Sequence, residues 1–158
     1  MRGRAKRLAE RLNAFNEEVI SFVDNCTDGD WGKLGSEGWP LGVTARHIGA
    51  NHYQAISAAK MIINGEKFPA MTMEQITENA NRHAVEHAEC TKSEVLDILR
   101  KQGRKIVEFA ESLDDSQLDK AGYLPALGSE ISVENFMETV ILQGAKGHFE
   151  SIRAAAAK

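Results

Sequence analysis

The residues of this chain whose types and spacing could carry chemistry are its five histidines. His47, Asn51 and Gln54 follow one another at intervals of four and three, the spacing of one face of an α-helix. A second helical stripe near the C-terminus ends at His148. We expect both imidazoles to point into the interior of a helical protein, where facing helices commonly build metal sites. The spacing alone leaves open that each is a core or rim histidine satisfied by hydrogen bonds.

A rival group of chemical residues lies on one short segment. His83, His87 and Cys90 are spaced by four and three, so they line one stripe, and a histidine pair four residues apart can chelate a metal. The alternative is a pair of half-exposed histidines beside a buried free thiol. His52 lies five residues after His47, off its face in an α-helix, and is expected at the surface.

The segments that must position these residues are predicted to be helices. Apolar residues recur at helical intervals, and no window alternates long enough to predict a strand. Thr72 with Gln75 and Thr91 with Glu94 form capping-box patterns at two helix starts, and Ser132 caps the last helix. The expected helices cover about 8–26, 40–63, 72–89, 91–113 and 132 onward, and glycine-rich loops cover 27–42 and 114–130.

These elements predict an all-α fold in a single domain, 1–158. Four long helical segments would pack around one core as a helix bundle, with an extra short helix before the third. The two long loops predict crossover connections rather than a plain up-and-down chain.

The composition excludes several classes of function. Of 158 residues, 42% are hydrophobic and 27% are charged, and two cysteines are too few for a disulfide scaffold. The net charge of -4 predicts no nucleic-acid partner. No apolar run could span a membrane and no leader pattern begins the chain, so we expect no membrane partner and a cytoplasmic location. The basic stretch from Arg2 to Arg11 is expected to be a solvated helix face, with a binding patch as the alternative.

Three stretches of the chain resemble the DinB-like (DfsB) superfamily. Residues 37–48, EGWPLGVTARHI, look like the start of that family's second helix, where a tryptophan precedes the first metal ligand. Residues 81–99 resemble the start of its third helix, and residues 144–153, GAKGHFESIR, resemble its closing motif. The likeness covers most of the chain in order and spacing.

The resemblance implies a DinB-like four-helix bundle, a homodimer and one divalent metal ion, zinc or nickel. His47 matches the first ligand of the family and His148 matches the last. The middle ligand, one turn before the last, falls on Gly144, which has no side chain to offer. His83 or His87 could supply the ligand that Gly144 lacks.

Two functions follow from this resemblance. The first is a DinB-like protein of unknown specific activity, whose metal site has decayed at Gly144 and whose cavity binds a small molecule. The alternative is a divalent-metal-dependent thiol transferase or hydrolase, in which the metal lowers the pKa of a bound thiol or water. In that enzyme Asn51 and Gln54 would orient the substrate. An interaction module that uses the basic first helix is a third possibility.

Overall fold

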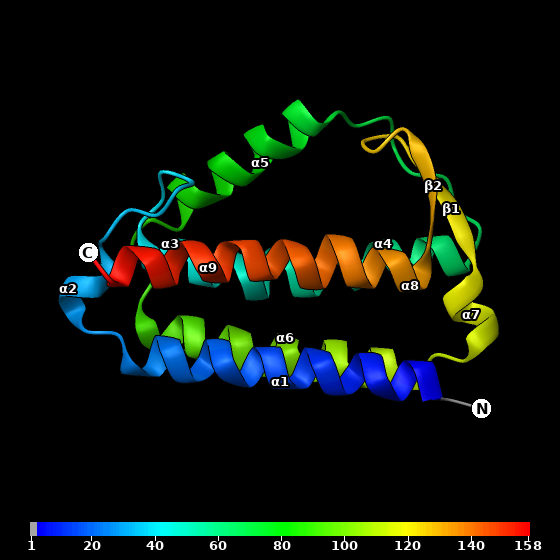
Figure 1. Cartoon of the computed structure of the whole chain (residues 1–158). Helices are drawn as coiled ribbons and strands as arrows, with labels where there is room; N and C mark the ends of the chain where they lie inside the picture. Colours follow the sequence, from blue (N-terminus) through cyan, green and yellow to red (C-terminus); the bar gives the residue numbers. More distant parts are fainter. Residues whose placement is uncertain (1–2) are drawn as a thin grey trace.

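The computed structural model describes residues 3–158 and is mostly helical, which confirms the all-α part of the predicted fold (Figure 1). Two of its four long helical segments are continuous helices, α1 (Gly3–Asn25) and α6 (Lys92–Ser112). The other two, residues 41–63 and 133–156, are each assembled from several helical stretches. Over the described range, every helix lacks the combination of length and apolarity that crossing a membrane requires.

The helices α1 and α6 pack lengthwise against each other and form one side of the core. The apolar stripe predicted for the first helix is buried at Leu8, Leu12, Phe15, Val19 and Cys26, and Phe22 is partly buried. Gly103 of α6 faces Asn16 of α1 so closely that a Cβ at position 103 would overlap the Asn16 amide. That amide donates a hydrogen bond to the carbonyl of Leu99 at 3.0 Å. The glycine therefore permits the close approach that this buried bond needs.

The second long segment changes its helical winding along its length. It starts with α3 (Leu41–His47) and continues without a break into η1 (Ile48–His52), η2 (Tyr53–Ala55) and α4 (Ile56–Ile63). The stretch η1 is a π-helix, and the Tyr53 N–H donates to the carbonyl of Ile48, five residues back. π-Helical turns are rare and often mark functional sites.

The last long segment also contains a π-helical stretch. It consists of α8 (Val133–Asn135), η3 (Phe136–Gln143) and α9 (Gly144–Ala156). Ser132 caps its start as predicted, because its side chain accepts the backbone N–H of Asn135. The π stretches η1 and η3 lie against each other.

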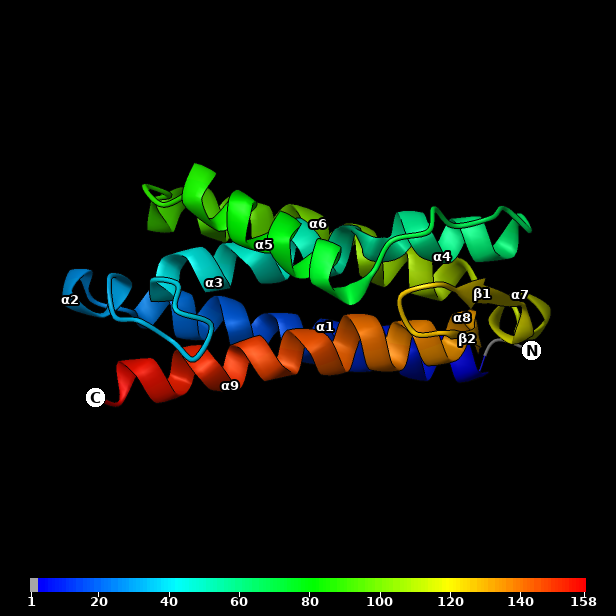
Figure 2. The ribbon, with the colours of Figure 1, turned by 90° about the horizontal axis from the view of Figure 1, so that it is seen from above.

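The shorter helix predicted before α6 is present as α5 (Met73–Glu86). The capping box of Thr72 and Gln75 is confirmed at its start. The helix stops at Glu86, short of its predicted end, and none of its residues is buried. It crosses above the bundle over the second segment (Figures 1 and 2).

The four long segments run side by side (Figure 2). The segment 41–63 packs against α6, while α3 also packs against α9. Phe149 of α9 meets Phe15 and Phe22 of α1 edge to face, with ring centroids 5.7 Å apart in both pairs. The loops after α1 and after α6 connect segments at opposite corners of this arrangement.

A small hairpin departs from the helical prediction. The strands β1 (Ala121–Leu124) and β2 (Ser129–Ser132) pair antiparallel, and Gly128 takes a φ of +66° in the connecting turn. The prediction of no strand is wrong here because four-residue strands are too short to show alternation in the sequence. The predicted loops also contain two short helices, α2 (Asp28–Trp31) and α7 (Asp115–Asp119).

Two arginines of the basic face of α1 form ion pairs with other parts of the chain. Arg4 donates to Asp119 at 2.7 Å and to Glu134 at 2.8 Å, and Arg11 pairs with Glu138. Arg2 lies outside the described residues. These ion pairs attach the start of α1 to α7 and to the last segment.

Candidate metal centre

Three histidine side chains converge between the second and last long segments. His47 ends α3, His52 ends η1 and His148 lies in α9. One ring nitrogen from each lies within 4.8 Å of the others, close enough for the three to hold a metal ion. The ring centroids are 4.8 to 5.2 Å apart. The two histidines expected to point inward, His47 and His148, do lie together, and we call the set of three the histidine triad.

The position of His52 corrects the expectation that it lies on the surface. In an α-helix, residues five apart differ by about 140° around the axis, which would turn His52 away from His47. The π-helical turn η1 has hydrogen bonds between residues five apart and brings the two side chains toward one face. The ring of His52 is largely buried and stands edge-on to His47.

Gly144, the position that lacks the middle ligand of the resemblance, makes room for His52. A Cβ at position 144 would lie 2.6 Å from Cε1 and 3.0 Å from Nδ1 of the His52 ring. These distances are shorter than real Cβ contacts. An imidazole from the neighbouring helix therefore occupies the space that a side chain at position 144 would fill.

A carboxylate holds the orientation of His148. Nδ1 of His148 donates to Oε2 of Glu37 at 2.6 Å, and Ser151 donates to the other oxygen of the same carboxylate. Metal-binding histidines commonly donate their second ring nitrogen to a carboxylate, which fixes the tautomer and raises the basicity of the ligand nitrogen. Glu37 therefore leaves Nε2 of His148 as the acceptor atom.

A backbone carbonyl holds His52 in the same way. Nδ1 of His52 lies 3.1 Å from the carbonyl oxygen of Val140 in η3. Because a carbonyl only accepts, Nδ1 carries the proton and Nε2 is the free donor atom for a metal. Two of the three rings are thus set in the tautomer that a metal ligand needs.

Burial keeps two rings of the triad, His47 and His52, uncharged near neutral pH. Desolvation, reinforced by the nearby His52 and His148, lowers the pKa of His47 to about 3. Desolvation and His148 lower the pKa of His52 to about 4, against the opposing hydrogen bond to Val140. Neutral imidazole is the form that binds divalent metals, so these rings are ready to coordinate without losing a proton.

The carboxylate beside the triad is held in its charged form. Burial alone would raise the pKa of Glu37, but the hydrogen bonds from Ser151 and His148 outweigh it and leave the pKa below its usual value. An ionised Glu37 adds negative charge next to His148, and this charge favours a cation at the triad.

The indole of Trp39 covers one side of the triad. Its ring stacks over His148 at 5.9 Å and meets His47 edge to face at 5.0 Å. Nε1 of Trp39 donates to Oδ1 of Asn81 in α5 at 3.0 Å. The tryptophan therefore links the triad to the helix above it.

The triad opens onto a cleft of about 650 Å³ that separates α5 from the bundle. Asn51 lines this cleft, in agreement with its predicted place beside His47. Gln54 does not line it. The altered winding of η1 and η2 turns Gln54 outward, where it lines a groove with Lys60 and Phe109.

The histidines of α5 do not form a comparable group. The helix ends before His87, so His83, His87 and Cys90 do not continue on one helical stripe. His83 is exposed and lines the cleft, whereas Cys90 is buried. Over residues 3–158, the triad is the only set of three or more potential ligands that is close enough for one ion.

Sequence reasoning missed two residues of this site, His52 and Glu37. Nothing in the local sequence marks η1 as a π-helix, so the five-residue spacing of His47 and His52 gave no reason to pair them. Glu37 lies two residues before Trp39 in a loop, and only the folded structure brings it to His148.

The fold and the geometry define a helical protein with a candidate three-histidine metal centre. Comparisons with known proteins add no relative, because no family model, no curated protein and no solved structure matches the chain.

Proposed function

We propose that this protein is a metal-dependent enzyme of DinB-like type, in which His47, His52 and His148 hold one zinc or nickel ion. The observation that carries the proposal is the convergence of three imidazoles beside a cleft. Catalytic zinc sites commonly use three protein ligands and keep a fourth position for water or substrate. The arrangement of four long segments with α5 in between is consistent with the DinB-like four-helix bundle that the resemblance implies.

The reaction class we propose is a hydrolysis or the transfer of a thiol. A bound divalent ion would lower the pKa of a coordinated water or thiol and so supply a nucleophile near neutral pH. Glu37 and the Val140 carbonyl orient two of the imidazoles, and Trp39 shields the triad from water on one side. Asn51 lies in the cleft wall, where its amide can hydrogen-bond a substrate.

The alternative of a decayed metal site rests on Gly144. The position of the His52 ring against Gly144 speaks against a decayed site. His52 supplies the third imidazole, so the site needs no side chain at position 144. Metal analysis of untagged protein separates the two functions. We expect near-stoichiometric zinc or nickel, lost in His47→Ala and His148→Ala, whereas a decayed site would give metal-free protein.

A homodimer, which the resemblance implies, is part of the same proposal. Sedimentation equilibrium over a range of concentrations tests it separately from the metal. A mass of 17.4 kDa at all concentrations would show a monomer. This result would refute the homodimer and leave the proposed metal site unaffected.

A further inference from the structure

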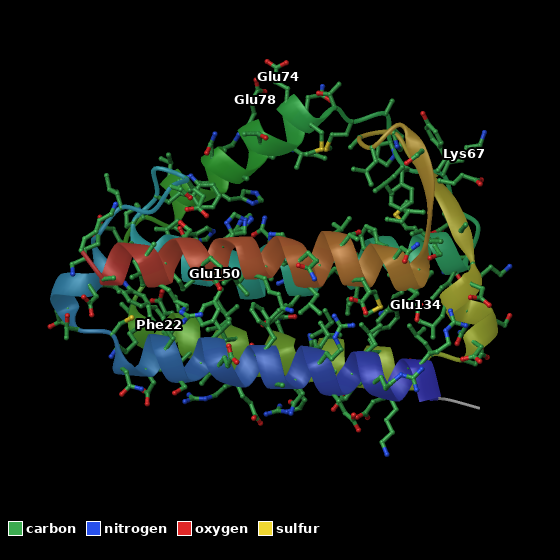
Figure 3. The ribbon with its side chains drawn as sticks, viewed as in Figure 1. Phe22, Lys67, Glu74, Glu78, Glu134 and Glu150 are labelled. Carbon is green, nitrogen blue, oxygen red and sulfur yellow. The ribbon has the colours of Figure 1, made fainter. Side chains whose placement is uncertain are left out.

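The cleft above the triad has one wall with an uncovered apolar face. Met73 and Ile76 of α5 both line the cleft, yet they are 53% and 39% exposed. Glu74 and Glu78 point away from the bundle on the outer side of the same helix (Figure 3). An amphipathic helix is stabilised by burying its apolar stripe. In α5 this stripe faces the cleft rather than the packed core.

Away from the triad, the described side chains that line the cleft include no lysine or arginine to bind an anionic group. The single carboxylate, Glu37, already accepts hydrogen bonds from His148 and Ser151. Arg46 does not line the cleft but an adjoining crevice of about 10 Å³, which shares Trp39, His47, Asn51 and His83 with it. A ligand carboxylate or phosphate in the cleft away from the triad would therefore lack the charged partner that such groups normally find.

Apart from the histidines and Glu37, the polar side chains that line the cleft are amides, a hydroxyl and an indole, which carry no charge. Asn51, Thr77 and Asn79 line it together with the apolar Met71 and the two apolar residues of α5. Small-molecule sites typically have volumes of about 300–1,000 Å³ and combine apolar walls with a few polar groups. At about 650 Å³ the cleft falls in this range.

We infer that the cleft binds a small molecule with a metal-binding head group and an uncharged, largely apolar body. The head group lies at the histidine triad, and the body lies along Met73 and Ile76. Only the part of this inference that concerns the head group rests on the proposed metal function. The body is selected by the walls of the cleft, and its binding covers the apolar face that α5 now exposes.

The first test uses cobalt-loaded protein and a series of monothiols, whose binding changes the visible spectrum of the metal. From ethanethiol to butanethiol, we expect each added methylene to lower Kd about fourfold, as for a methylene removed from water. 6-Mercaptohexanoate and 6-aminohexanethiol, whose charged group lies too far from the sulfur to chelate the same ion readily, should bind more weakly than hexanethiol. Equal affinities along the series, or tighter binding of either charged thiol, would overturn the inference.

Two variants of α5 test whether the cleft wall causes the dependence of Kd on chain length. Ile76→Asn should flatten the dependence on chain length and leave the affinity for ethanethiol nearly unchanged. Val85→Asn is the matched control, because Val85 lies on the same helix, is 78% exposed and does not line the cleft. If Val85→Asn reduced butanethiol binding as much as Ile76→Asn, the cleft wall would not be the selecting surface.

A second test needs no metal and so separates the two proposals. N-Phenyl-1-naphthylamine and 8-anilinonaphthalene-1-sulfonate share one aromatic body, and the second adds a sulfonate. Metal-free protein should bind the uncharged dye more tightly, and Ile76→Asn should weaken that binding. Absence of cobalt loading together with this dye preference would refute the metal function and support the cleft. Preference for the sulfonate, or no effect of Ile76→Asn, would refute the inference about the cleft even in protein that binds cobalt.

Discussion

The two groups of histidines in this molecule differ in the number of structural elements that position them. The triad takes its rings from two long segments, and a loop carboxylate and a backbone carbonyl orient two of them. His83 lies in the last turn of the single helix α5 and is exposed, and His87 follows directly after the end of that helix. Favourable spacing of histidines along one helix therefore does not by itself bring three ligand atoms together. Convergence through packing, together with outer partners, brings the ligands together.

The largest expected difference between the two groups is in metal affinity. His52→Ala removes one ligand of the triad, so zinc affinity should fall by more than the roughly 10–100-fold that loss of an outer partner costs. His83→Ala should leave the affinity unchanged, because His83 is not part of the triad. Competition with a chromophoric chelator measures both. Equal losses of zinc affinity in the two variants would indicate that His83 of α5 also binds the metal.

The space left by the missing side chain of Gly144 should affect zinc affinity nearly as much as the ligands do. Gly144→Ala places a Cβ against the His52 ring, so the ring must move and zinc affinity should fall by about 100-fold, the upper end of what a disturbed outer partner costs. Gly147→Ala is the matched control, because nothing lies within 4 Å of its Cβ position. It should keep zinc affinity and raise the free energy of unfolding by about 1 kcal/mol through helix propensity. Unchanged affinity in Gly144→Ala would contradict the close fit of His52.

A smaller effect is expected from the partner of His148. Glu37→Gln keeps the size of the side chain but removes its charge, so zinc affinity should fall by about tenfold. Glu150→Gln changes an exposed carboxylate of α9 that pairs with Arg153, and it should have no effect on the metal. Isothermal titration with both variants checks this. A similar loss in both would indicate a general effect of net charge rather than the orientation of His148.

A further effect is expected on the pH dependence of stability without metal. The pKa values of His47 and His52 are about 3 and about 4 in the folded protein, below the ordinary 6.5. Between pH 6.5 and 4 the unfolded chain binds protons that the folded state does not, so stability should fall as the pH falls. Each buried histidine contributes at most about 1.4 kcal/mol per pH unit. Urea unfolding at pH 7 and pH 5 should show a shallower loss in His52→Asn than in the parent.

Much of the fold could be predicted from the sequence because its signals are local. The stripe of α1 and the capping boxes of α5 and α6 each depend on residues within a few positions of one another. The hairpin at 121–132 was missed because its strands are too short to show a period of two.

The candidate site could be predicted only in part. His47 and His148 were identified from helical stripes and from the resemblance, and they do lie together. His52 was assigned to the surface because the prediction assumed α-helical winding, whereas the chain forms a π-helical turn there. Glu37 and Gly144 act through contacts with residues far along the chain, and such contacts leave no mark in local spacing.

X-ray absorption spectroscopy of the zinc-loaded protein tests the central claim most directly, because it identifies and counts the atoms bound to the metal. We expect three imidazole nitrogens at about 2.0–2.1 Å in the parent, two in His52→Ala and three in His83→Ala. Two imidazoles in the parent, or a signal that changes in His83→Ala and not in His52→Ala, would contradict this claim.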